Sequence, residues 1–255
     1  MSEAPTTPRI VAFDSIDSTN AEAHRRAAAG ERGPLWIIAA RQEAGRGRSG
    51  RAWSSPVGNF SATLLMTPEG ASPAKYHQLA FVSGLAAWEA LTACGANKQV
   101  LQLKWPNDLM IDDAKLGGIL VESTRFDGDD VIMIGIGINL AVAPEVQDRK
   151  VTHLAGHGSL IAPETLLAEL APAMTRWLEV WDGGRGFETV RSAWGPRAHP
   201  QGQPLSVKGH GREYRGTFEG LGPDGRLEMT TEDGERVSLD HGDVALLQTT
   251  GAGEA

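Results

Sequence analysis

The sequence predicts an α+β protein in which helices pack on a largely antiparallel sheet and a small all-β unit follows. Short β-rich runs between residues 101 and 140 are joined by turns such as Pro-Asn-Asp and Asp-Gly-Asp-Asp, which is typical of a meandering antiparallel sheet. From Pro204 onward no helical period recurs, and short strands alternate with Pro-Asp-Gly and Glu-Asp-Gly turns. We therefore expect one domain over residues 1–200 and a second over residues 201–255.

The elements of the first half follow from cap signals and from hydrophobic periodicity. Strands are predicted over residues 9–13, 35–41 and 59–66. Thr19, with Glu22 three residues later, forms a capping box that predicts the start of an alanine-rich helix ending at Gly30. Apolar residues at three- and four-residue spacing predict a second helix over residues 76–94, packed on the sheet.

The second half is rich in short strands. We predict strands over residues 101–105, 109–111, 115–122 and 131–140 and a helix over residues 164–181. The tail after Pro204 favours a small barrel or sandwich, with its boundary close to His199.

Composition and charge exclude several classes of protein. A chain of 255 residues with 41% hydrophobic and 22% charged residues has enough apolar material for a folded core. The net charge of -8 argues against a surface wholly devoted to nucleic acid or anionic membrane. The single cysteine, Cys94, excludes a disulfide framework and a multi-cysteine metal site. Because we find no signal peptide and no apolar run of spanning length, we expect a cytoplasmic protein with no membrane partner.

A loop after the second predicted strand concentrates glycine and arginine. The three glycines of residues 45–50 fit the pattern G-x-G-x-x-G. A dinucleotide-binding turn must open a helix, however, and Trp-Ser-Ser-Pro at residues 53–56 breaks the chain instead. We therefore reject a Rossmann site.

The same loop carries a local positive charge inside an acidic protein. Arg46, Arg48 and Arg51 stand on a flexible backbone, and guanidinium groups suit phosphate and carboxylate oxygens. Trp53 is costly to expose and offers a face on which a base can stack. The loop thus favours a mononucleotide site, with a solvated surface loop or an arginine-glycine nucleic-acid contact as the alternative.

Three further positions point to polar chemistry inside apolar strands. Lys104 either reaches solvent or meets an anion, and Asp108 is its partner or a magnesium ligand. Lys115 enters a strand beside two glycines that permit close approach of a ligand. Asn139 ends an apolar strand, where its amide either pairs with an adenine edge or caps the strand.

Together these segments resemble biotin protein ligases over most of the chain. The resemblance rests on five segments: Asp-Ser-Thr-Asn at 17–20, Gly-Arg-Gly-Arg-Ser-Gly-Arg at 45–51, Lys-Trp-Pro-Asn-Asp-Leu at 104–109, Lys-Leu-Gly-Gly-Ile-Leu-Val-Glu at 115–122 and Gly-Ile-Gly-Ile-Asn at 135–139. It implies a catalytic domain with a mixed sheet, related to class II aminoacyl-tRNA synthetases, followed by an SH3-like barrel. Some members carry an N-terminal helix-turn-helix, and the few residues before the first strand predict the monofunctional type without that domain.

The resemblance also implies the site residues. The expected biotin site comprises Ser18, Thr19, Asn20, Gln42, Gly45, Arg46, Gly47, Arg48 and Lys115. The expected ATP site comprises Arg48, Arg51, Trp53, Lys104, Asn107, Asp108, Lys115 and Asn139. The expected catalytic residues are Lys115, Arg48 and Lys104, with Asp108 as a ligand of Mg²⁺. Ser49 stands where an arginine is common in the family, which removes one charge from the loop.

Within this resemblance, Lys115 would contact the reacting carboxylate and the α-phosphate, Trp53 would stack on adenine, and Asn139 would read the adenine edge. The implied activity is ATP-dependent activation of biotin to biotinyl-5′-AMP and transfer to a lysine of biotin carboxyl carrier protein, with Mg²⁺. We expect no sequence-specific DNA binding, and a homodimer is left open. The alternatives are a lipoate or octanoate ligase of the same fold and a non-catalytic RNA-binding module.

Overall fold

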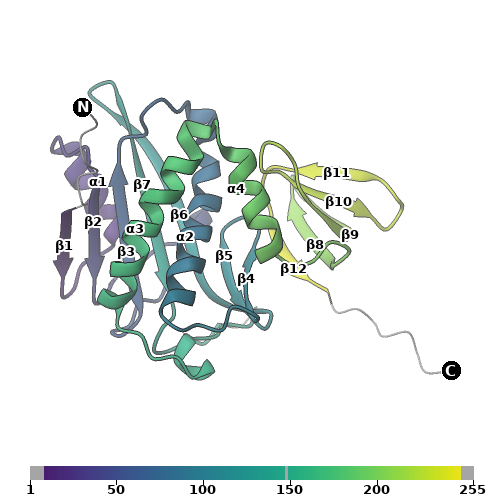
Figure 1. Cartoon of the computed structure of the whole chain (residues 1–255), viewed down its shortest axis with the longest axis horizontal. Coiled ribbons are helices and arrows are strands. Elements are labelled where there is room, and N and C mark those ends of the chain that lie inside the picture. Colours follow the sequence, from purple (N-terminus) through teal and green to yellow (C-terminus); the bar gives the residue numbers. More distant parts are fainter. Residues whose placement is uncertain (1–8, 147–148, 248–255) are drawn as a thin grey trace.

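A seven-stranded sheet forms the body of the protein in this computed structural model, which describes residues 9–146 and 149–247. Its strands are β1 (Arg9–Phe13), β2 (Leu35–Ala39), β3 (Phe60–Met66), β4 (Leu101–Lys104), β5 (Asp108–Ile111), β6 (Ala114–Phe126) and β7 (Asp129–Ile138). Their order is β1-β2-β3-β7-β6-β5-β4 (Figure 1). β1 pairs with β2 in parallel and the other neighbours pair antiparallel, which confirms the predicted mixed, largely antiparallel sheet.

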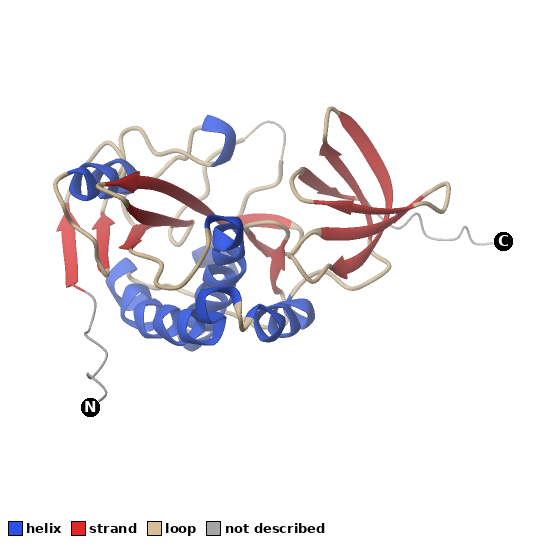
Figure 2. Ribbon diagram, turned by 90° about the horizontal axis from the view of Figure 1, so that it is seen from above, coloured by secondary structure: helices blue, strands red, loops and turns tan. Residues whose placement is uncertain are grey.

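Helices cover both faces of this sheet. They are α1 (Thr19–Ala28), α2 (Leu79–Ala93), α3 (Pro163–Trp181) and α4 (Phe187–Trp194), with short 3-10 turns between elements. Along β2 the side chains alternate, because Leu35 and Ile37 pack with α1 while Trp36 and Ile38 join the larger core with α2 and α3. Seen from above, α2 and α3 lie on one side of the sheet and α1 lies on the other (Figure 2). Helix α4 was not predicted: its buried residues Phe187, Val190 and Trp194 stand at helical spacing, but the pattern spans only eight residues, which is at the short end of helix lengths in globular proteins.

The start of α1 corrects the predicted capping box. Ser18, one residue earlier, is the N-cap: it has an extended backbone and its Oγ accepts a hydrogen bond from the Ala21 N–H at 3.5 Å. The Thr19 N–H instead donates to Oε1 of Gln42 at 2.8 Å, and Glu22 pairs with arginines one turn later. The predicted pairing of Thr19 with Glu22 is therefore wrong, because both side chains have partners outside the cap.

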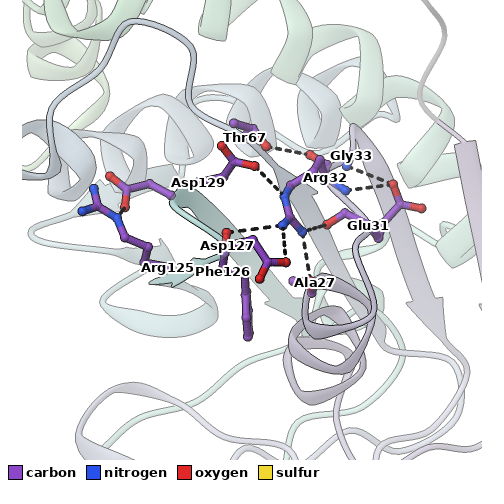
Figure 3. A network of polar contacts seen from close by, with 10 residues as sticks. Ala27, Glu31, Arg32, Gly33, Thr67, Arg125, Phe126, Asp127 and Asp129 are labelled. Atoms are coloured by element: carbon purple, nitrogen blue, oxygen red, sulfur yellow. Dashed lines mark hydrogen bonds and ion pairs between the residues drawn. The ribbon is translucent and has the colours of Figure 1, made fainter.

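The far end of α1 is tied to the turn between β6 and β7 by Arg32 (Figure 3). Its guanidinium donates to the carbonyl oxygen of Ala27 at 3.0 Å and to that of Phe126 at 3.3 Å, and its Nε lies 3.0 Å from Asp129. Helix α1 is thus fixed at its C-terminal end. Its N-terminal end, which carries Ser18 to Asn20, points toward the middle of the sheet, where Asn20 lies over Gly135 of β7.

A second, antiparallel sheet follows α4, as predicted. Its strands are β8 (Pro204–Gly209), β9 (Arg212–Leu221), β10 (Leu227–Thr231), β11 (Arg236–Leu239) and β12 (Asp243–Leu246), in the order β11-β10-β9-β8-β12. It lies beside the β4 end of the large sheet (Figure 1). One cluster of buried side chains runs through both units, so the division at residue 200 stays a prediction. None of the described helices is long and apolar enough to cross a bilayer.

Candidate active site

A cleft of about 1400 Å³ opens on the α1 face of the large sheet. It is lined by the predicted site residues Ser18, Thr19, Asn20, Gln42, Arg46, Gly47, Arg48, Arg51, Trp53, Lys104, Asn107, Asp108, Lys115 and Asn139. Gly45 differs from them, because it lies in the backbone behind the lining, where a Cβ would stand 2.5 Å from the carbonyl oxygen of Trp53. Residues predicted from segments far apart in the sequence are therefore brought together in one place.

Strand register explains why the floor of the cleft is flat. One row of paired residues crosses five strands: Ser61, Gly137, Gly118, Asp108 and Lys104. The adjacent row contains Thr63, Gly135 and Leu120. Because paired residues face the same side of a sheet, glycines form the centre of the floor and charged side chains its β4 end.

The two glycines of β7 hold side chains that come from elsewhere. A Cβ added at Gly135 would stand 2.3 Å from Oδ1 of Asn20, and one added at Gly137 would stand 2.5 Å from Nε1 of Trp53. Real Cβ atoms cannot approach so closely, so Asn20 and Trp53 lie directly on the strand only because these positions are glycine. This role of the two glycines could not be predicted from the sequence, since it depends on contacts between segments far apart in the chain.

One end of the cleft is a buried polar network at the start of α1. The backbone N–H and the hydroxyl of Thr19 lie 2.8 and 3.1 Å from Oε1 of Gln42, whose Nε2 donates to Oγ of Ser55 at 2.8 Å. Ser18 and Thr19 are buried and belong to the lining of the cleft. This end offers fixed donors and acceptors to a small polar ligand.

Asn20 is oriented by two strands of the floor. Its Oδ1 accepts a hydrogen bond from Thr63 at 2.6 Å, and its Nδ2 donates to Oε2 of Glu122 at 2.7 Å. Thr63 is fully buried. The Asn20 amide therefore has a defined orientation before any ligand arrives, because its oxygen and nitrogen have different partners. Neither Thr63 nor Glu122 was predicted as part of the site.

At the other end of the floor two lysines share one carboxylate. Nζ of Lys115 lies 2.5 Å from Oδ1 of Asp108, and Nζ of Lys104 lies 3.5 Å from Oδ2 of the same residue. Burial lowers the pKa of Lys115 below the usual lysine value, while the charge and hydrogen bond of Asp108 oppose that shift. With two ammonium groups and one carboxylate, this cluster keeps an excess positive charge toward the cleft.

The arginine loop, residues 45–51, reaches the cluster formed by Asp108 and the two lysines. Nη1 of Arg48 donates to Oδ1 of Asn107 at 3.0 Å, and Asn107 is itself fixed by a hydrogen bond from its Nδ2 to the carbonyl oxygen of Ile119 at 2.6 Å. The Gly47 N–H donates to the carbonyl oxygen of Arg51 at 2.8 Å, which closes a tight turn. Ser49 in that turn has φ 57°, a conformation that non-glycine residues seldom adopt.

The C-terminal sheet supplies one wall of the cleft. Arg51 forms a two-point ion pair with Asp243 of β12, and the hydrogen bond of Arg51 lowers the pKa of Asp243. Nζ of Lys104 donates to the carbonyl oxygen of Val244 at 3.0 Å. Sequence reasoning missed Asp243, because an aspartate in a turn-rich tail gives no sign of which cation it meets.

Trp53 and Asn139 both lie at the C-terminal end of β7. Trp53 lies over Gly137, with Nζ of Lys115 5.8 Å from its ring centre. Asn139 is nearly fully buried, accepts a hydrogen bond from Asn59 at 3.4 Å and donates one to the carbonyl oxygen of Thr152 at 3.1 Å. Its amide keeps one N–H and one lone pair for a ligand, so a contact to adenine stays a prediction.

Asp108 does not present a free carboxylate to a metal ion. Each of its oxygens faces an ammonium group, Oδ1 toward Lys115 and Oδ2 toward Lys104. A protein-held Mg²⁺ would have to displace one of these pairs, whereas Mg²⁺ bound to the triphosphate of ATP belongs to the substrate. The expected role of Asp108 as a metal ligand therefore stays a prediction, and the structure favours its role as the partner of the two lysines.

Further cleft residues were also outside the prediction. They include Asp113, Arg149, Lys150, Gln203, Ser206 and Lys208. The stretch before Val151 is brought to the cleft by a backbone bridge, in which the Lys115 N–H donates to the carbonyl oxygen of Lys150 at 2.9 Å. The basic pair at 149–150 was the available signal, but a basic pair in a loop is more often solvated.

Comparison with known proteins identifies the family to which the chain belongs. Residues 12–139 match the model of the biotin/lipoate A/B protein ligase family. The chain is 40% identical to a biotin--[acetyl-CoA-carboxylase] ligase of Paracoccus denitrificans over 87% of this chain and 94% of that protein. It is 35% identical to the bifunctional ligase/repressor BirA of Escherichia coli over 88% of this chain and 70% of that protein.

Solved structures match the fold as a whole. The biotin protein ligase of Aquifex aeolicus in complex with biotin and ATP superposes with a TM-score of 0.77 at 24% identity, covering 94% of this chain and 99% of that one. The biotin protein ligase of Leishmania major in complex with biotinyl-5-AMP gives 0.64 at 26% identity, covering 93% and 100%. These likenesses confirm the predicted fold class. The chain belongs to the biotin/lipoate A/B protein ligase family.

Proposed function

We propose that this protein is an ATP-dependent biotin protein ligase. The observation that carries the proposal is the meeting, in one cleft, of a buried polar network at the start of α1 and a cationic cluster at β4 and β6. The first suits the polar ureido ring of biotin, and the second suits a carboxylate approaching a triphosphate. The similarity to named biotin ligases supports the same assignment.

The reaction has two steps. In the first, a carboxylate oxygen of biotin attacks the α-phosphorus of ATP, and the bond to the β,γ-diphosphate breaks to give biotinyl-5′-AMP and pyrophosphate. In the second, the neutral amine of a carrier lysine attacks the acyl carbon, and AMP leaves as the amide forms and the amine loses a proton. The chain needs no nucleophile of its own, so its contribution is positioning and neutralisation of charge.

Lys115 is the proposed centre of the first step. The carboxylate and the phosphate repel each other as they approach, and a unit charge at about 4 Å is worth about 4 kcal/mol at an effective dielectric near 20. Lys115 is partly buried, with 14% of its side chain exposed, lines the cleft and shares Asp108 with Lys104. We assign Lys104, Arg48 and Arg51 to the phosphates, and Trp53 with Asn139 to adenine.

The arginine loop is the proposed lid. An acyl-adenylate hydrolyses in water, so the site must exclude solvent between the two steps. The hydrogen bond between Arg48 and Asn107 joins two residues of the cleft lining and would hold the loop closed over the intermediate. Arg46 and Gly47 line the same region, next to the polar network that we assign to biotin.

Pyrophosphate release tests the proposal and its rivals together. A biotin ligase releases pyrophosphate only when biotin and ATP are both present, and it then adds one biotinyl group to purified biotin carboxyl carrier protein of acetyl-CoA carboxylase or a related carboxylase. Equal turnover with lipoate or octanoate would identify a lipoate-type ligase instead. Absence of turnover with tight RNA binding would favour the binding-module alternative, which the paired carboxylates around the cleft cations disfavour.

The proposal includes partners and location. The macromolecular partner is the carrier protein, with biotin and Mg-ATP as small-molecule substrates. We continue to predict a cytoplasmic location and no sequence-specific DNA binding, with a homodimer left open. Residues 1–8, on which the prediction of no N-terminal DNA-binding unit rests, lie outside the described residues.

A further inference from the structure

Three side chains that could hold a metal ion meet outside the cleft, at one end of the C-terminal sheet. They are His210, in the turn between β8 and β9, and Asp240 with His241, in the turn between β11 and β12. Nε2 of His210 lies 3.1 Å and Nδ1 of His241 lies 2.6 Å from the same oxygen, Oδ1 of Asp240. The potential ligand atoms of the three residues all lie within 4.8 Å of one another.

The backbone fixes these two turns against each other. β8 pairs antiparallel with β12, with Lys208 opposite Asp243, so the turns at their ends lie side by side. A Cβ at Gly209 would stand 2.7 Å from the carbonyl oxygen of His241, and one at Gly242 would stand 2.5 Å from Cγ1 of Val207. Both glycines therefore permit a close approach that other residues would prevent.

We propose that His210, Asp240 and His241 form a binding site for a divalent transition-metal ion of the zinc type. Two imidazole nitrogens and one carboxylate oxygen are the donor set that such ions prefer. In a tetrahedral zinc site with bonds of about 2.1 Å the ligand atoms are about 3.4 Å apart. The 3.1 Å separation between His210 and Asp240 is close to this value, whereas the 2.6 Å contact between His241 and Asp240 is a hydrogen bond that a bound ion would replace, with the two exposed side chains moving slightly apart.

The surroundings suit an open site rather than a buried one. The three side chains are about half exposed, at 43%, 52% and 57%, so an ion reaches them from solvent and water completes its coordination. The two rings are 4.2 Å apart between centroids and tilted by 58°, so neither is stacked flat on the other. A bound ion would link the β8–β9 turn to the residues that precede Asp243. The site is independent of the proposed ligase function.

Zinc titration of the untagged, full-length chain after chelator treatment tests this site. We expect one Zn²⁺ per chain with micromolar or tighter affinity by calorimetry, and a rise in melting temperature of about 2–4 °C at saturating metal. His210→Asn and Asp240→Asn should each weaken binding by about 10- to 100-fold. His210→Asn suits the left-handed backbone at this position, where φ is 52°.

Two controls keep the result specific. His24→Gln, in α1, should bind zinc as the unmodified chain does, because His24 lies outside the cluster. The His210 and Asp240 variants should match the unmodified chain in melting temperature when chelator is present, which excludes unfolding as the cause of lost binding. Millimolar affinity, or equal affinity in the His210→Asn and Asp240→Asn variants, would overturn the assignment.

Discussion

The ammonium group of Lys115 lies 2.5 Å from Oδ1 of Asp108, above Gly118 on the floor of the cleft. A Cβ at Gly118 would stand 3.1 Å from the same ammonium nitrogen, so the glycine leaves room for the lysine to lie along the sheet. Asp108 also pairs with Lys104, at 3.5 Å. The pair therefore fixes the position of Lys115 and sets how readily it loses its proton.

This relationship predicts the alkaline limit of adenylate formation. Burial lowers the pKa of Lys115 and Asp108 raises it, so Asp108→Asn should lower that pKa further. Because activity needs the protonated lysine, the rate falls as pH rises through its pKa, and the fall should begin at lower pH in the variant. The profile of kcat/KM for ATP against pH measures this limit.

Asp113→Asn is the matched control for that profile. Asp113 lines the cleft, and its left-handed backbone tolerates asparagine. Asp113 is not among the groups that shift the pKa of Lys115. The alkaline fall of kcat/KM in Asp113→Asn should therefore occur at the same pH as in the unmodified chain. If kcat/KM in Asp108→Asn falls at the same pH as in the unmodified chain, or at a higher pH, the role of Asp108 is contradicted.

Gly135→Ala and Gly137→Ala should separate the two ligands. The first forces Asn20 from its position and should weaken biotin binding, whereas the second displaces Trp53 and should weaken ATP binding. Stacking on a base is worth about 1–3 kcal/mol, so the loss of ATP affinity should be about 5- to 150-fold, as in Trp53→Ala. Calorimetric titration of each variant with each ligand measures the effect.

An open, exposed glycine provides the comparison for these variants. Gly195 has no neighbouring atom within 4 Å of its Cβ position, so Gly195→Ala should leave both affinities unchanged. Equal loss of biotin and ATP affinity in Gly137→Ala would argue that Trp53 is a packing residue rather than a nucleotide contact.

The ion pair between Arg51 and Asp243 should matter for ATP more than for folding. Both side chains are about half exposed, at 48% and 55%, and pairs of this kind contribute about 0–1 kcal/mol to stability. We expect Arg51→Ala to raise the KM for ATP while the biotin affinity and the free energy of unfolding stay nearly unchanged.

A charge swap tests the same pair more sharply. Arg51→Asp combined with Asp243→Arg rebuilds an ion pair with the charges exchanged. If the pair only holds the C-terminal sheet in place, the double variant should recover the activity that each single variant loses. Our assignment of Arg51 to phosphate predicts that the KM for ATP stays high.

The sequence predicted the charged half of the site better than its floor. Lys104 was singled out because a lysine in an apolar strand is costly to bury without an anionic partner, and Lys115 because two adjacent glycines permit close approach of a ligand. The arginine loop was singled out because its guanidinium groups, on a flexible backbone, suit an anion. The function of Gly135 and Gly137 depends on which side chains cross β7, and Asp243 meets Arg51 across 192 residues. Such contacts follow from register and domain placement, which local pattern does not contain. The capping box failed for a related reason, because Gln42 competes for the Thr19 N–H.

Arg48→Gly should release biotinyl-5′-AMP before transfer. Loss of the guanidinium removes the hydrogen bond to Asn107, while the polar network around Gln42 is untouched. The adenylate should dissociate faster, by about 10-fold or more if a charge-assisted bond of about 1.5–3 kcal/mol is lost. Its half-life on the enzyme, and stray labelling of lysines on bystander proteins, measure the release.

Ser49→Gly distinguishes lost contact from added flexibility. It relieves the left-handed backbone at φ 57° and loosens the turn, but it keeps Arg48. We expect retention of the adenylate close to that of the unmodified chain. Equally rapid release from both variants would show that loop stiffness, rather than the Arg48 contact, retains the intermediate.

The most direct test of the account is the amount of biotinyl-5′-AMP formed in a single turnover with biotin and Mg-ATP. Mass spectrometry of the quenched reaction should find one adenylate per unmodified chain and a rate lower by about 10²- to 10³-fold in Lys115→Ala. Circular dichroism should show the variant folded, and Lys98→Ala, which is not part of the cleft lining, should react normally. If the unmodified chain forms no adenylate, or Lys115→Ala forms it at the unmodified rate, the central claim is contradicted.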